Sequence, residues 1–402
     1  MLNNVSLKNA PLLLRWARTF EMLLFILPVA VLFYQYKGLT VGDFFLFQGI
    51  FSISKFLFEI PSGYLGDVFS RKKIIILSFL AILCAFITYY FFSGFYWMFL
   101  AEIFFGVSMS LYSGTGEAYL YDVLKKQGRE KDFIKEEAKI KSWTIFGTAF
   151  ATFTGGAIYQ YWGADTMILI ETFFVLIGFI LTMFLPDIPE VKRVVEKGKS
   201  KFKDILDIVK YTIKHAEIKW LILYPAVFGA GTKVLLWAMQ PLMKSAEIPV
   251  VLFGVFLGLN QIFRGTLAHF SHYIFQKLKT NKLSILLFLL LVIGTASAIL
   301  IPSLNEKVYI YVLLIVMAFA ISSQVVLGIV TRSMMNHRIK SDERATVLSV
   351  SSMFNSAFSG VSMIALKFLI DGTTLQNTFI VIGLVILVLT VYPLKKLLRL
   401  KI

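Results

Sequence analysis

The sequence is short of charge, of acidic residues and of cysteine. Only 16% of its 402 residues are charged and 57% are apolar, which excludes an ordinary soluble globular protein. Cys84 is the only cysteine, so no intramolecular disulfide can form and no cysteine-based metal site is expected. The sequence also lacks a phosphate-binding Gly-rich loop, a His-Glu-x-x-His zinc pair and a Gly-x-Ser-x-Gly elbow. We therefore expect no enzymatic activity, no cofactor and no metal.

Long apolar runs take the place of these features. A helix needs about 20 mainly apolar residues to cross a bilayer. The run 283–293 is apolar at every position except Ser284, which favours helices over the alternating strands of a barrel. Twelve candidate transmembrane helices lie at about 12–36, 40–62, 73–93, 96–123, 140–160, 165–186, 217–243, 250–275, 282–302, 307–332, 345–370 and 374–394. The sequence predicts an all-α membrane protein.

The net charge of +16 follows the membrane topology. Of the 40 Lys and Arg residues, 33 fall in alternate connections between the predicted helices. Lys and Arg gather in cytoplasmic connections, so both termini and the long middle connection are predicted to be cytoplasmic. The basic excess therefore does not indicate a nucleic-acid partner, and the lipid bilayer is the expected surrounding.

The predicted helices form two groups of six. Residues 1–190 hold the first group, 217–402 hold the second, and the basic stretch 191–216 connects them. In this connection five apolar residues recur at helical spacing: Phe202, Ile205, Leu206, Val209 and Ile213. This spacing predicts an amphipathic helix on the cytoplasmic membrane surface. The alternative is a solvated linker in which the spacing arises by chance.

The connection between the second and third predicted helices carries the most specific motif. It reads Gly-Tyr-Leu-Gly-Asp-Val-Phe-Ser-Arg-Lys-Lys over residues 63–73. It resembles the loop signature of the major facilitator superfamily, Gly-x-Leu-(Ala/Ser)-Asp-Arg-x-Gly-Arg-(Arg/Lys). The matching residues are Gly63, Leu65, Asp67, Arg71 and Lys72. Val68 and Ser70 depart from the signature.

The resemblance implies two pseudo-symmetric bundles that alternate access to a central site. It also implies that Asp67 faces the start of the eleventh helix near Arg344, as a clasp between the halves; the alternative is that Asp67 only ends its helix. The stretches 113–118 and 121–122 resemble a branch of bacterial permeases described as drug or metabolite exporters. Residence in a bacterial inner membrane is therefore expected.

Acidic residues inside predicted helices are candidates for proton coupling. An ionisable side chain costs about 2.5–3.5 kcal/mol at the bilayer centre on insertion scales, so each one indicates an interior path or a buried pair. Glu21 and Glu117 are the leading candidates, because they lie in the first and fourth helices, which line the cavity in the resembled family. Glu59 and Glu102 are further candidates. The alternative for Glu59 is a simple pair with Lys55 on one helix face.

Basic and polar residues inside the helices are candidates for binding substrate. Lys233 and Arg264 lie near the middle of the seventh and eighth predicted helices. They would suit an anionic substrate; the alternative is that they pair internally with Glu21 or Glu117. The further candidates are Asn260, Lys55, Trp237 and Gln324.

These features predict a secondary active transporter of a small amphiphilic or anionic organic compound. The resemblance favours proton coupling, and it favours export over import. The expected partners are the small-molecule substrate, protons and lipid, with the protein acting as a monomer. Two alternatives remain open: an importer of an anionic metabolite such as a carboxylate-rich chelator, and a membrane sensor on the same fold that binds without transporting.

Overall fold

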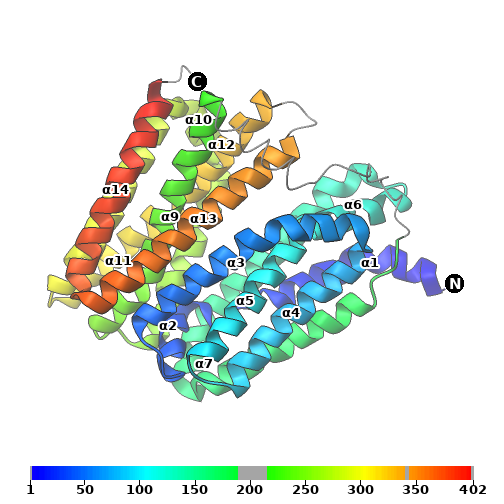
Figure 1. The fold of residues 1–402 in the computed structure, drawn as a ribbon, viewed down its shortest axis with the longest axis horizontal. Coiled ribbons are helices and arrows are strands. Elements are labelled where there is room, and N and C mark those ends of the chain that lie inside the picture. The colour runs from blue at the N-terminus through cyan, green and yellow to red at the C-terminus, as the bar shows by residue number, and fades with distance from the viewer. Residues whose placement is uncertain (1, 189–214, 340–343, 400–402) are drawn as a thin grey trace. The chain divides into compact units, whose positions relative to one another are not determined.

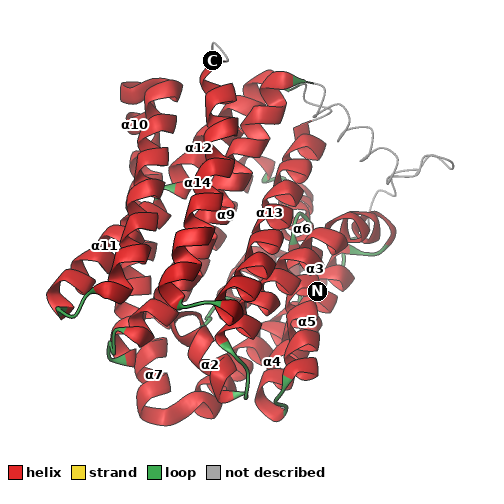
Figure 2. Cartoon of the chain, turned by 60° about the vertical axis from the view of Figure 1, so that its left-hand side comes forward, coloured by secondary structure: helices red, strands yellow, loops and turns green. Residues whose placement is uncertain are grey.

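The computed structural model describes residues 2–188, 215–339 and 344–399. It consists of helices, and no strand occurs within these three ranges (Figure 2). The elements of Figure 1 are α1 (Leu2–Glu21), η1 (Leu27–Val29), α2 (Ala30–Tyr36), α3 (Val41–Val68), α4 (Arg71–Phe91), α5 (Phe95–Tyr112), α6 (Thr115–Lys126), η2 (Glu130–Asp132), α7 (Phe133–Met183), α9 (Ala216–Ser245), α10 (Val250–Leu300), η3 (Ile301–Ser303), α11 (Lys307–Ser322), α12 (Gln324–Arg338), α13 (Arg344–Gly372) and α14 (Leu375–Arg399).

The described helices include nine segments that are long and apolar enough to cross a membrane. Two of these segments, 130–183 and 250–303, have 54 residues each, far more than the ~20 that one crossing needs. Each is divided by one residue in the left-handed region, Gly163 (φ 83°) in α7 and Lys279 (φ 53°) in α10. The all-helical membrane fold is thus confirmed, while the count of twelve crossings remains a prediction.

The first membrane segment differs from its prediction. We expected one helix over 12–36, but α1 ends at Glu21 and the chain continues irregularly to η1 and α2. Pro28 stands in the first turn of η1. Proline has no backbone N–H and its ring clashes with the preceding helical turn, so it favours a kink or a break at this position. The expectation of a continuous first helix was wrong.

Two further segments are interrupted, one in each half of the sequence. α5 and α6 are separated at Ser113 and Gly114, where Gly114 has φ 72°. α11 and α12 are separated at Ser323. In membrane proteins, non-helical backbone is tolerated where it is buried in protein or lines a cavity. Both interruptions therefore indicate positions at which a site could form.

The contacts divide the chain into two units. Unit 1 comprises residues 1–39 and 50–198, and unit 2 comprises residues 40–49 and 199–402. The start of α3 thus groups with unit 2 and the rest of α3 with unit 1. Most of the predicted linker and its amphipathic helix lie outside the described residues.

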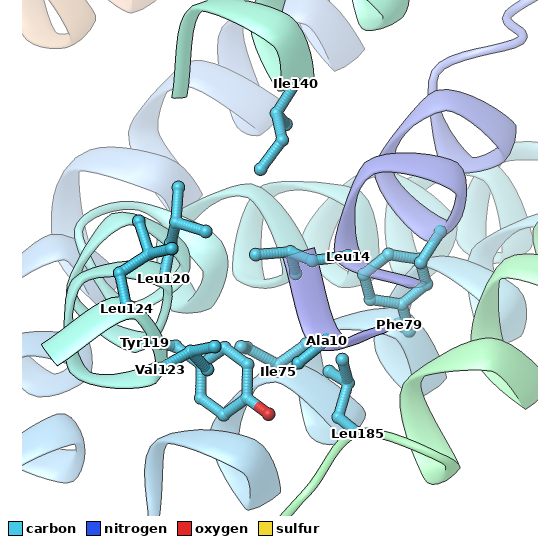
Figure 3. Packing of buried hydrophobic residues seen from close by; sticks show 11 residues of the cluster. Ala10, Leu14, Ile75, Phe79, Tyr119, Leu120, Val123, Leu124, Ile140 and Leu185 are labelled. Atoms are coloured by element: carbon cyan, nitrogen blue, oxygen red, sulfur yellow. The ribbon is translucent and has the colours of Figure 1, made fainter. Parts of the chain in front are cut away.

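A cluster of buried apolar side chains holds one end of unit 1 together (Figure 3). Ala10 and Leu14 of α1 pack with Ile75 and Phe79 of α4, and residues of α6, Ile140 of α7 and Leu185 after α7 complete the cluster. These side chains are at most 8% exposed. Because lipid supplies no hydrophobic drive between helices, this close packing stabilises the bundle chiefly through van der Waals contact.

In unit 2, α9 packs against α13 and α14. α9 is buried along most of its length. Small residues allow the close approach: a Cβ at Gly231 would come within 2.5 Å of Ile386 in α14. α10 packs against α11, which completes the surroundings of the site described next.

Candidate functional site

A cavity of about 290 Å³ opens among four helices of unit 2. α9 contributes Pro225, α10 contributes Arg264, and α13 contributes Asn355. The remaining lining comes from α12, as Gln324, Val325, Leu327, Gly328, Ile329 and Arg332. Gln324 lies directly after the interruption between α11 and α12, so the cavity is built where that segment breaks.

The spacing on α12 explains how its polar residues reach the cavity. Gln324, Gly328 and Arg332 are four residues apart and therefore share one helix face. No atom lies within 4 Å of the position that a Cβ on Gly328 would occupy, so the face stays open between the two polar residues. On the α9 side, a Cβ at Gly229 would lie 2.6 Å from Gln324 Nε2 and 3.2 Å from Asn355 Oδ1.

The two arginines dominate the electrostatics of this cavity. Arg264 and Arg332 are both exposed in the protein, although they belong to membrane segments. Neither guanidinium has a hydrogen bond or an ion pair with another residue of the described structure. No Asp or Glu is among the lining residues. Arginine stays protonated in proteins, so the cavity holds two positive charges without an acidic neighbour in its lining.

Unit 1 contains a larger cavity, of about 400 Å³, beside the interruption between α5 and α6. Two of the three cations that line it, Arg18 and Lys141, are paired with acids. Arg18 binds Glu21 at 2.6 Å and lies over the ring of Tyr112. Lys141 lies 3.2 Å from Glu117 and also pairs with Glu137. This cavity therefore has mixed charge and offers an anion less than the unit 2 cavity does.

The predicted acidic candidates lie in different surroundings within unit 1. Glu21 is fully buried at the end of α1, whereas the Glu117 side chain is 57% exposed. Glu59 accepts a hydrogen bond from the Ser113 hydroxyl at 3.4 Å. Glu102 is buried and accepts hydrogen bonds from two phenols, those of Tyr34 and Tyr89. The structure thus does not gather the four acids in one place.

The predicted substrate residues also separate. Arg264 and Gln324 line the unit 2 cavity, and Lys55 lines the unit 1 cavity. Lys233 and Trp237 are not among the residues that line the unit 2 cavity. Trp237 is buried with its ring 5.2 Å from that of Phe44.

Asn260 is buried beside the interruption between α11 and α12. Its Nδ2 donates to the Ala318 carbonyl at 2.9 Å and to the Ser322 hydroxyl at 2.8 Å. These bonds occupy the amide group within the protein. Asn260 therefore supports the end of α11, next to the point where Gln324 enters the cavity.

Part of the loop motif is described. Arg71 donates to the Ala118 carbonyl at 2.9 Å and pairs with Asp122. Lys72 lies 3.9 Å from Asp187. Arg71 thereby joins the loop motif to the stretch 113–122, two patterns that were separate in the sequence. Gly63 lies in the last part of α3, while the side chains of Asp67 and Arg344, and with them the predicted clasp, lie outside what the structure describes.

Sequence reasoning missed Arg332, which stands at the end of the predicted tenth helix and was counted with the cytoplasmic loop charges. The signal that could have found it is its spacing of eight residues from Gln324 on one helix. It also left Glu171 of α7, an acid inside the sixth predicted helix, out of the candidates, although its side chain is 0% exposed. Within the described residues, no group of three or more His, Cys, Asp or Glu side chains could hold a metal ion.

Several known proteins are similar to this chain. It is 27% identical to the uncharacterized transporter BU466 of Buchnera aphidicola subsp. Acyrthosiphon pisum over 172 residues, which cover 41% of each protein. Among solved structures it is similar to the nucleoside transporter NupG, with a TM-score of 0.77 and 14% identity over 96% of this chain and 99% of that one. It is also similar to a POT family transporter in complex with 5-aminolevulinic acid, with a TM-score of 0.73 and 12% identity over 96% and 94%.

The structural similarities establish the fold, since their identities are low. The family follows from the sequence: the model of the Major Facilitator Superfamily matches residues 17–333, well over half of the chain. This chain belongs to the Major Facilitator Superfamily and is an all-helical membrane transporter.

Proposed function

We propose that this transporter carries a small organic anion, which binds between Arg264 and Arg332 in the unit 2 cavity. The transporter works by alternating access as a proton-coupled exporter in a bacterial inner membrane. It is a monomer with both termini in the cytoplasm. The loop motif supports alternating access, the distribution of Lys and Arg supports the cytoplasmic termini, and the cavity supports the charge of the substrate.

The pair of arginines in one cavity is the observation that carries the proposal. Two guanidinium groups line a cavity without an acidic lining residue, and neither has a partner among the described residues. A guanidinium group inside a membrane segment costs free energy when no counter-charge is near it. A carboxylate or phosphate group bound between the arginines offsets that cost, and arginine binds such groups through two parallel hydrogen bonds. Gln324 and Asn355 add neutral donors and acceptors for the rest of the molecule.

The size of the cavity restricts the substrate. A volume of about 290 Å³ suits a small metabolite. The POT family transporter of similar fold was solved with 5-aminolevulinic acid, a small molecule with one carboxyl group. At 12% identity this similarity does not transfer the substrate, but it supplies a probe of suitable size that carries a carboxylate.

The experiment is a thermal-shift panel on the purified protein, followed by transport in liposomes. The panel contains 5-aminolevulinate, small dicarboxylates and phosphate esters, each paired with its carboxyl ester or unphosphorylated form. We expect the compounds that carry a free carboxylate or phosphate group to stabilise the protein and the partners that lack this group not to. Equal stabilisation by the partners that lack the anionic group would contradict the proposal.

Liposome measurements then distinguish a transporter from a sensor. The anion that stabilises the protein most is loaded outside the liposomes, and a pH gradient is imposed in either direction. Accumulation of the anion against its concentration gradient supports proton-coupled transport. Accumulation driven by protons that flow into the liposome indicates symport, and accumulation driven by protons that flow out of it indicates antiport. Binding without movement in either direction would instead indicate a sensor.

A further inference from the structure

The break in the first membrane segment replaces the regular helical hydrogen bonds between Met22 and Leu27. In a continuous helix the Ile26 N–H would donate to the Met22 carbonyl four residues earlier. Here Phe25 N–H donates to Leu23 and Leu27 N–H donates to Leu24, so the regular pattern is lost. The Met22 carbonyl and the Ile26 N–H therefore do not bind each other, and each needs another hydrogen-bond partner. In a membrane such groups require protein partners, because no water is available in the hydrocarbon region.

Two side chains of α7 supply those partners. The Thr148 hydroxyl donates to the Met22 carbonyl at 2.9 Å. Glu171 Oε2 accepts from the Ile26 N–H at 3.2 Å. Thr148 precedes the division of α7 at Gly163 and Glu171 follows it. Both parts of α7 therefore form hydrogen bonds with the backbone of the interrupted segment. Gly155 lets α7 approach, because a Cβ there would collide with the Phe25 carbonyl.

Glu171 differs from Thr148 in that it can hold a proton. It is 0% exposed, and its second oxygen, Oε1, has no hydrogen-bond partner in the described structure. No cation is paired with it among the described residues. An ionised carboxylate in this position would accept one hydrogen bond, from a neutral N–H group, and would have no counter-charge beside it. Burial of this kind favours the protonated carboxyl group.

The charged and titratable groups of the neighbouring elements do not change this conclusion. On α4, the Tyr89 phenol lies within electrostatic range of Glu171 and donates to Glu102. On α1, Arg18 is bound by Glu21. η1 has no titratable side chain.

The charges of α6 and η2 that reach α7 do so near its start. There Lys141 pairs with Glu117 and Glu137, and Glu136 pairs with Arg15, Arg129 and Lys139. Asp165, nearer to Glu171 in sequence, is bound by the phenol of Tyr36 and lies 3.8 Å from Lys37. These groups are thus occupied by one another.

We propose that Glu171 is a proton-binding site that controls the break at residues 22–29. With the break closed and dry, Glu171 keeps its proton. When the break opens and water reaches it, the carboxyl O–H bond breaks, the proton passes to water, and the hydrated carboxylate remains. Proton release and opening of the first segment are therefore one event. This inference rests on the proposed proton-coupled transport and identifies where the proton binds.

Hydrogen–deuterium exchange of the full-length protein in lipid nanodiscs tests the proposal without any substrate. Exchange of the peptide covering 22–29 is followed as a function of pH and corrected for intrinsic exchange chemistry. In the wild type we expect protection of this peptide to fall as pH rises. In Glu171→Gln, which retains an acceptor for Ile26 N–H and cannot ionise, protection should not depend on pH.

Thr148→Val is the matched control, because it removes the other support of the break without removing a titratable group. We expect lower protection of 22–29 at every pH, with the dependence on pH retained. Persistence of the pH dependence in Glu171→Gln, or its loss in Thr148→Val, would overturn the proposal.

An infrared measurement on the wild type keeps the test decisive if Glu171→Gln does not fold. The absorption of protonated carboxyl groups should decrease over the same pH interval in which protection of 22–29 falls. A decrease at a different pH, or none, would also overturn the proposal. Since neither measurement uses a substrate, failure here is distinct from failure of the anion proposal, which depends on Arg264 and Arg332.

Discussion

Asn260 and Ser322 bind one another in both directions across two helices of unit 2. The Asn260 side-chain amide donates to the Ser322 hydroxyl at 2.8 Å, and that hydroxyl lies 3.0 Å from the Asn260 backbone carbonyl. Ser322 is the last residue of α11, so this contact fixes the point at which the segment breaks. The cavity residue Gln324 follows two positions later. A buried asparagine that the sequence indicated for substrate binding thus supports the backbone beside the cavity.

We predict that Asn260→Ala destabilises the protein without abolishing recognition of anions. The substitution removes the donors to Ala318 and Ser322, and a buried group left without its partner costs about 1–3 kcal/mol. Thermal unfolding of the purified protein measures this effect. Asn305→Ala is the control, because Asn305 is exposed in the connection before α11. Unchanged stability with loss of ligand binding would show that Asn260 contacts substrate directly.

Substitutions of Arg264 can show whether this residue binds substrate or forms an ion pair inside the protein. Because no described residue is paired with it, we predict that Arg264→Ala leaves thermal stability unchanged in the absence of ligand and weakens binding of the anion found in the panel. Arg264→Lys should also weaken binding by roughly tenfold or more, since lysine keeps the charge and loses the planar pair of donors. Early unfolding of Arg264→Ala with normal binding would contradict this prediction.

Gly155 is predicted to tolerate no side chain. A Cβ there would meet the Phe25 carbonyl, a backbone group that cannot rotate away. Overpacking of this kind costs about 1–3 kcal/mol, so Gly155→Ala should lower the unfolding temperature. Gly265→Ala is the matched helical control, because no atom lies within 4 Å of its Cβ position and alanine favours the helix. Equal effects of the two substitutions would show that the approach of α7 to the break is not tight.

The phenols that bind Glu102 should contribute to stability in a coupled manner. Tyr34 and Tyr89 both donate to Glu102 and lie 3.2 Å from each other through their hydroxyl groups. We predict that Tyr89→Phe costs about 1 kcal/mol, typical of one buried hydrogen bond. The double substitution with Tyr34→Phe should differ from the sum of the two single effects, because the groups share one network. Tyr96→Phe, at an exposed position of α5, should be neutral. Additivity would mean that the two bonds act independently.

The sequence predicted the helices well because apolar length is a direct consequence of the bilayer. It placed the connections near Gly163 and Lys279, where long helical stretches are divided. It did not predict the interruption after Glu21, although Pro28 stands inside the expected helix. Apolar residues continue on both sides of the break, so hydropathy alone cannot reveal it.

The sites were less predictable, because a cavity depends on which helix faces meet. Arg264 and Gln324 were chosen as charged or polar residues inside apolar segments, and they share a cavity. Arg332 carries the same chemistry but lies near the end of its predicted helix, where arginine is common for reasons of topology. The burial of the Glu171 side chain also depends on the helices that surround it. The sequence does not show that Glu171 binds the backbone N–H of Ile26.

The support of the first segment by α7 has a consequence for biosynthesis. The hydrogen bond from Ile26 to Glu171 joins residues 145 positions apart. At synthesis rates of about 5–20 residues per second, the first segment waits roughly 7–30 s for this partner. α1 is also absent from the apolar spans found in the described helices. Until α7 has been made, the opened backbone at 22–29 must be shielded by the insertion machinery or by water at the membrane interface, so the first segment to be synthesised cannot reach its final structure before the seventh helix of the chain has followed it.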